Sequence, residues 1–156
     1  MEFLYLIIGV VIVGTLAFIF QRYRRKKALK LIQLDSQKLT YSVMEASLKN
    51  LKLLNESLAA SALISDVWGK GVMAFEYQLE VKDLTNADLN GLKKQLEQQL
   101  AVHAKAQGIR GYQQNRAFVV SDIWLKDGIL HIDVSYLVNK ATVEYVNDMN
   151  TLEQNN

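Results

Sequence analysis

The feature that most constrains this fold is an uncharged, apolar stretch close to the start of the chain, at residues 3–20. Its 18 residues, FLYLIIGVVIVGTLAFIF, would cover about 27 Å as an α-helix, close to the ~30 Å hydrocarbon core of a bilayer. A helix is the only single-pass structure that satisfies its backbone hydrogen bonds inside lipid. The sequence therefore predicts a transmembrane anchor over residues 1–21.

The charges around this stretch predict its orientation. One acidic residue, Glu2, precedes it, and a basic strip follows it at Arg22, Arg24, Arg25, Lys26, Lys27 and Lys30. Lys and Arg next to a span stay on the cytoplasmic side, and this order is the reverse of a cleavable signal peptide. We expect a single-pass protein of a bacterial inner or plasma membrane, with its N-terminus outside, its C-terminal domain in the cytoplasm and its basic strip on anionic lipid head groups.

Residues 22–64 form the basic strip and a predicted helical stalk. From Ala28 to about Ile64 there is no Gly or Pro, which predicts one long helix, or two helices broken near residues 34–36. Two readings of the stalk remain open. A coiled-coil homodimer would use the heptad positions a (Leu34, Tyr41, Leu48, Asn55, Ala62) and d (Gln37, Met44, Leu51, Leu58). Additional apolar residues beside these positions widen the apolar face and favour packing against the chain's own sheet.

Residues 65–140 are expected to form a small α+β domain. Strict alternation from Val72 to Lys82 predicts a half-buried strand. Thr85, with Asp88 three residues later, predicts a capped helix start, and Gly108 predicts the helix end.

Asp127-Gly128 separates two further alternating runs and predicts a hairpin with a type I′ turn. Such a turn fixes the register of the strands 117–126 and 129–138, pairing Lys126 with Ile129, Trp124 with His131, Asp122 with Asp133 and Val120 with Ser135. The result is a β-α-β-β sheet with a ferredoxin-like layout, by analogy only. A short helix and a frayed tail are expected over residues 141–156.

Composition and motifs exclude several function classes. The chain has no cysteine, which excludes a disulfide scaffold, a thiol nucleophile and the usual zinc and iron–sulfur sites. Nucleotide-binding, zinc-protease and hydrolase motifs are absent from the sequence. Without the basic strip and Glu2, 12 Lys+Arg remain against 15 Asp+Glu, which argues against nucleic-acid binding. We therefore expect no enzymatic activity and no cofactor.

The non-core face of the hairpin is the predicted interaction surface, with Phe118, Val120, Trp124, Ile129, His131 and Leu137. Apolar side chains on both faces of a sheet indicate that both are covered or that one docks a partner. We expect an assembly adaptor that binds a protein partner or forms a homodimer at the membrane. Two alternatives remain: a metal-dependent enzyme or sensor that uses Asp122, His131 and Asp133, and an envelope secretion or pilus subunit with its domain outside the cytoplasm.

Overall fold

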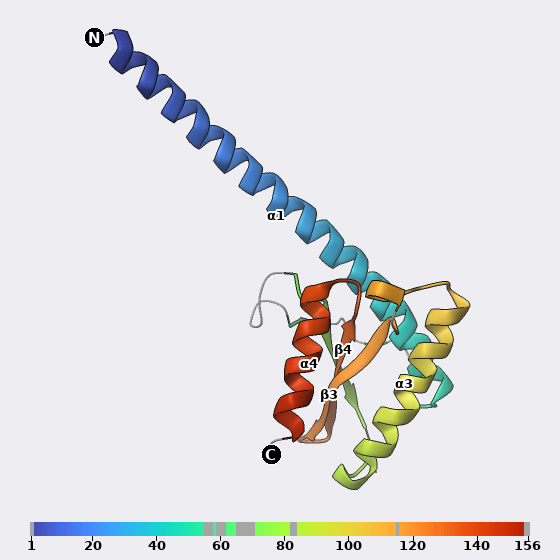
Figure 1. The fold of residues 1–156 in the computed structure, drawn as a ribbon. Coiled ribbons are helices and arrows are strands. Elements are labelled where there is room, and N and C mark those ends of the chain that lie inside the picture. The colour runs from blue at the N-terminus through green and yellow to red at the C-terminus, as the bar shows by residue number, and fades with distance from the viewer. Residues whose placement is uncertain are drawn as a thin grey trace. The chain divides into compact units, whose positions relative to one another are not determined.

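The computed structural model describes residues 2–54, 58, 62–64, 71–81, 84–114 and 116–154; for residues 2–6, 8, 10, 114, 153 and 154 it describes the backbone alone. The chain forms two compact units, Met1–Leu34 and Asp35–Asn156. Its described elements, in chain order, are α1 (Glu2–Asn50), β1 (Ala62–Leu63), β2 (Ala74–Glu80), η1 (Asn86–Asp88), α3 (Leu89–Ala106), η2 (Tyr112–Gln114), β3 (Phe118–Lys126), β4 (Ile129–Tyr136) and α4 (Lys140–Gln154) (Figure 1).

In the first unit residues 2–34 are helical, and here the structure differs from the predicted membrane anchor. Among the residues described, no helix has both the length and the apolar character needed to cross a membrane. The basic strip follows the apolar residues in the same helix. The rest of the predicted span, at residues 3–6, 8 and 10, has side chains outside the described part. The transmembrane anchor, its orientation and the inner or plasma membrane location are therefore wrong as predictions.

Helix α1 continues without a break through residues 34–36 and ends at Asn50, well before Ile64. Lys52 adopts a left-handed conformation with φ of 58°. The N–H of Leu53 donates to the carbonyl oxygen of Leu48 at 3.0 Å, and the N–H of Lys52 donates to that of Lys49 at 3.0 Å. This pair of bonds is a Schellman motif, which satisfies the last carbonyls of a helix and ends it. The predicted stalk is therefore one helix, and it is shorter than expected.

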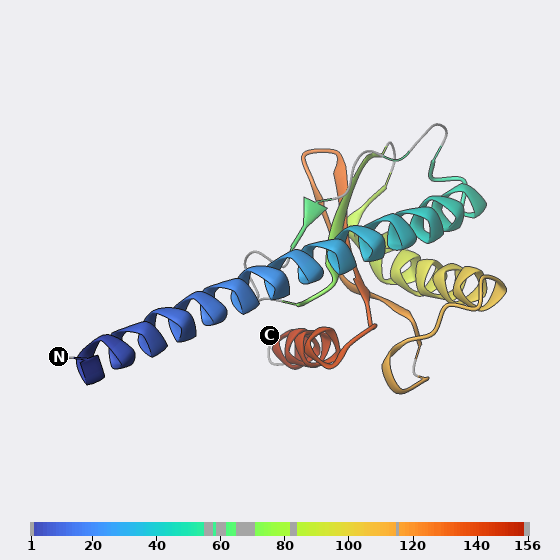
Figure 2. The ribbon, with the colours of Figure 1, turned by 90° about the horizontal axis from the view of Figure 1, so that it is seen from above.

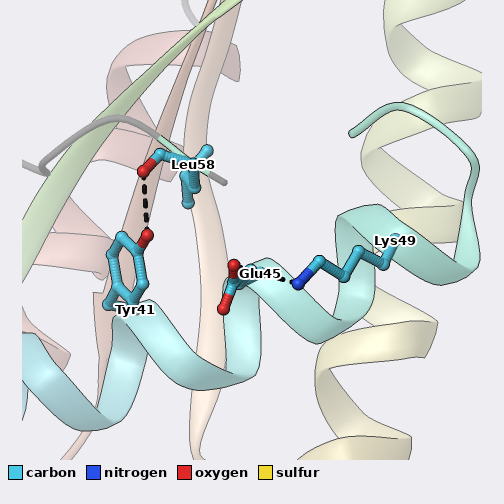
Figure 3. A network of polar contacts seen from close by, with 4 residues as sticks. All are labelled: Tyr41, Glu45, Lys49 and Leu58. Atoms are coloured by element: carbon cyan, nitrogen blue, oxygen red, sulfur yellow. Dashed lines mark hydrogen bonds and ion pairs between the residues drawn. The ribbon is translucent and has the colours of Figure 1, made fainter. Parts of the chain in front are cut away.

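From Asp35 onward, α1 buries one face in the α+β unit. Its buried residues recur at helical spacing: Ser36, Thr40, Val43, Met44, Ser47 and Leu48. Met44 and Leu48, two of the heptad positions, have no exposed surface, so the chain's own core contains them. The Tyr41 hydroxyl donates to the carbonyl oxygen of Leu58 at 2.8 Å, which fastens the returning chain to the helix, and Lys49 pairs with Glu45 at 3.0 Å on the same helix (Figure 3).

The sheet has four antiparallel strands in the order β1-β2-β4-β3. The α+β class is thus confirmed. Strand β4 lies between β2 and β3, so β2 and β3 run parallel without being neighbours, and α3 makes the connection between them. The short strand β1 lies within the segment that the sequence predicts as helix.

Helices cover both faces of the sheet. In Figure 1 the sheet lies between α3 and α4, and Figure 2 shows α3 alongside the last turns of α1. Asn50 at the end of α1 donates to Gln99 of α3 at 3.1 Å. On the other face a smaller cluster joins α4 to the sheet: Val72, Ala74, Val119, Leu137, Tyr145 and Val146.

The local signals around α3 are confirmed. The backbone N–H and the hydroxyl of Thr85 both donate to Oδ2 of Asp88, at 3.0 and 2.7 Å, and these bonds lower the pKa of the Asp88 carboxyl. The apolar residues on one side of α3 are buried: Leu92, Leu96, Leu100 and Ala104. Gly108 has φ of 67°, and the N–H of Ile109 donates to the carbonyl oxygen of Ala104 at 2.9 Å, which closes the helix.

Candidate functional site

The hairpin has the predicted turn and, for most of its length, the predicted register. Asp127 and Gly128 have φ of 51° and 78°, as a type I′ turn requires. Lys126 lies opposite Ile129, Trp124 opposite His131 and Asp122 opposite Asp133. Beyond Asp122 the register shifts by one residue, so that Val120 lies opposite Val134 and Val119 opposite Ser135. The predicted pairing of Val120 with Ser135 is therefore wrong.

A β-bulge at Ser121 causes this shift. The Ser121 side chain is buried, its hydroxyl donates to the carbonyl oxygen of Asp133 at 3.2 Å, and it accepts a hydrogen bond from the Ser135 hydroxyl at 3.1 Å. An extra residue in one strand exchanges the faces of all residues beyond it. Val119 consequently packs in the α4 cluster, and Phe118 and Val120 share the face of Val134 and Tyr136.

The structure places the six predicted interaction residues in two groups. Phe118, Val120 and Leu137 are buried, and the Phe118 ring stacks on Tyr136 with centroids 4.9 Å apart. Trp124, Ile129 and His131 are half-buried. Together with the exposed Lys126 opposite Ile129, these three residues form the part of the sheet next to the turn, which we call the hairpin surface: Trp124, Lys126, Ile129 and His131.

The aromatic pair of the hairpin surface is linked to the neighbouring strand β2. The rings of Trp124 and His131 are stacked, with centroids 4.7 Å apart and planes 10° apart. Nδ1 of His131 lies 2.8 Å from Oε1 of Glu76 on β2. The hydrogen bonds from His131 and then Gln78 lower the pKa of the Glu76 carboxyl. A half-exposed tryptophan fixed in this way has little rotamer freedom left to lose when a partner binds.

Three carboxylates lie in a row beside this pair. In the sheet register Asp133 is opposite Asp122 on one side and opposite Glu76 on the other. Burial, followed by the negative charges of Glu76 and then Asp122, raises the pKa of Asp133 to about 7. Its Oδ1 atom is buried without a hydrogen-bond partner in the described part of the chain. Asp133 therefore changes charge near neutral pH, as a carboxyl crowded by like charges does.

The arrangement does not assemble the metal site considered from the sequence. Within the described ranges, no group of three or more His, Cys, Asp or Glu could hold a metal ion. Nδ1 of His131 is directed at Glu76, and Oδ1 of Asp122 accepts the N–H of Ile123 at 2.7 Å. Asp122 and His131 thus bond to different groups, and Oδ1 of Asp133 is buried without a partner in the described part of the chain.

Glu76 is a member of this site that the sequence did not predict. The alternation of β2 predicts that Glu76 lies on a strand, but no local signal shows that β4 pairs with β2.

Comparison with protein-family models, with curated proteins and with solved structures gives no match for this chain.

Proposed function

We propose that this chain is a non-enzymatic interaction protein that docks a protein partner in an assembly. The observation that supports this most directly is the exposure of apolar side chains on the part of α1 that belongs to the first unit, up to Leu34. Its described large apolar side chains are each 43% to 67% exposed: Ile7, Val11, Ile12, Val13, Leu16, Phe18, Ile19, Phe20, Tyr23, Leu31, Ile32 and Leu34. Extended exposed apolar surface marks an interaction site, so a helix of the partner is proposed to cover this segment.

The hairpin surface is the proposed second contact, on the α+β unit. Trp124 has the size, partial exposure and fixed orientation of a binding anchor, and Lys126 supplies a charge at its border. Two separate binding elements on one chain raise the overall affinity, because the second contact forms within an existing complex.

Affinity purification of the full-length chain from its own cells tests this proposal. Phe20→Asp places a charge in the apolar segment at a side chain that is 62% exposed, and Trp124→Ala removes the half-buried anchor of the hairpin surface. We expect one partner protein with the unsubstituted chain and at least tenfold less of it with either variant.

Matched controls separate this result from a general loss of binding. Gln21→Asp adds the same charge one residue away, and Val102→Ala shortens another exposed apolar side chain, on α3. Both controls should retain the partner. A chain that purifies alone as a monomer, or a partner retained equally by all four variants, would contradict the proposal.

A further inference from the structure

A cleft lies on the α+β unit between α3 and the chain that leads from α3 into β3. Its volume is about 680 Å³, and it is lined by α3 and by residues 108–110 and 116–118. Volumes of 300–1,000 Å³ are typical of sites that bind small molecules. The hairpin surface contributes no residue to it.

The lining of this cleft is strongly basic. Lys94 and Lys105 come from α3, and Arg110 and Arg116 from the chain that follows, against a single carboxylate, Glu97. That carboxylate is already engaged: its Oε1 accepts the N–H of Val120 at 3.3 Å, and its Oε2 lies 3.6 Å from Arg116.

Three of the four cations have no compensating carboxylate within the described ranges. Lys94, Lys105 and Arg110 have no acidic partner among the residues that the structure describes. Like charges that converge on one concave surface repel one another, and a bound anion relieves that repulsion. Arginine also binds phosphate and carboxylate groups through two parallel hydrogen bonds.

The base of the cleft is apolar. Ala104, Ala117 and Phe118 are buried, and Ile109 is half-buried. Two backbone hydrogen bonds link this part of the chain to the residue after β4: the N–H of Tyr112 donates to the carbonyl oxygen of Leu137 at 2.5 Å, and the N–H of Leu137 donates to that of Ala117, a lining residue, at 2.7 Å.

From this lining we infer that the cleft binds a small organic anion with at least two negative charges next to a compact apolar group. The apolar group would contact the base near Ala117, and the charges would lie between Lys105 and Arg110. Phosphate and carboxylate anions share this chemistry. This inference does not depend on the proposed function, since it concerns a different surface.

Calorimetric titration of the full-length chain with phenyl phosphate and, separately, with phthalate tests the inference. We expect saturable binding of at least one probe. Binding of phenyl phosphate alone assigns the site to phosphates, and binding of phthalate alone assigns it to carboxylates. Arg110→Gln and Lys105→Gln should each weaken binding about tenfold or more, because each removes a charged hydrogen-bond donor from the cleft.

Lys38→Gln is the matched control, since it removes one exposed positive charge outside the cleft and should leave the affinity unchanged. Equal weakening by Lys38→Gln and Arg110→Gln would show attraction to net charge alone and would overturn the inference. Absence of saturable binding for both probes would also overturn it, as would binding of a poly-glutamate peptide alone.

Discussion

Asp133 lies directly opposite Asp122 in the ladder between β4 and β3, with its own carboxyl group buried in the sheet. Glu76 flanks it on the other side, so the folded chain surrounds this carboxyl with negative charge. The pKa of about 7 that results places the charge change of Asp133 near neutral pH.

Asp133→Asn is predicted to change the pH dependence of stability. Because the pKa of Asp133 is raised from its ordinary 3.8 to about 7 in the folded chain, folding is favoured while the carboxyl is protonated. This contribution is complete below about pH 4 and is lost as the pH rises through 7. Between pH 5 and pH 9 the unsubstituted chain should lose about 1–3 kcal/mol of unfolding free energy relative to the variant. This is less than the free energy that corresponds to the full pKa difference, because water screens part of the effect. Urea denaturation at both pH values measures this, and a constant difference would contradict the assignment.

Asp122→Asn should lower the pKa of Asp133 without restoring its ordinary value. The substitution removes one of the two neighbouring negative charges, while burial, the largest cause of the shift, remains. Carbon-13 titration of the side-chain carboxyls measures the change directly. Asp127→Asn is the control, because it removes the same charge at a turn position with φ of 51° that asparagine also adopts. An equal effect from both variants would rule out the local interaction.

Thr142→Val is expected to destabilise the α+β unit by about 1–3 kcal/mol, because it leaves a buried N–H without a partner. The buried Thr142 hydroxyl accepts the N–H of Met73 at 2.9 Å and donates to Oδ1 of Asn139 at 3.0 Å, which joins the start of α4 to the residue before β2. Thr142→Ser keeps the hydroxyl and should recover most of the loss in chemical denaturation. If serine and valine cost the same, the hydrogen bond would not be the cause.

Substitution of glycine by alanine should change the stability of the chain in opposite directions at two positions. Gly91 lies in α3 with open space around it, so Gly91→Ala should stabilise the chain by about 0.5–1 kcal/mol through helix propensity. Gly128 has φ of 78°, and Gly128→Ala should destabilise by about 1 kcal/mol or more, because that conformation is unfavourable for a residue with a Cβ. Thermal unfolding of the two variants gives both signs in one experiment, and equal signs would exclude these backbone effects.

Features set by a few neighbouring residues could be predicted from the sequence. Asp127-Gly128 determines its own turn, and that turn pairs Trp124 with His131 and Asp122 with Asp133. The end of α3 is likewise determined by a neighbouring residue, Gly108, whose φ is positive. In each case the backbone conformation that the turn or cap requires is one that its own residues favour.

Features that depend on distant segments could not be predicted. Ser121 produces a bulge because its hydroxyl is buried among β4 groups, and no residue beside it signals an insertion. Lys52 ends α1 in a left-handed conformation that glycine usually supplies, so the end of the helix had no sequence signal. The position of β4 beside β2, which brings Glu76 to His131, likewise follows from packing of the whole sheet.

The exposed apolar segment of α1 is proposed to contact a protein. Photo-crosslinking in living cells can detect this contact, with benzoylphenylalanine in place of Phe20 in the otherwise unchanged chain. We expect one discrete protein adduct that becomes much weaker when Trp124→Ala is added. No adduct, or adducts only of the mass of a lipid, would contradict it.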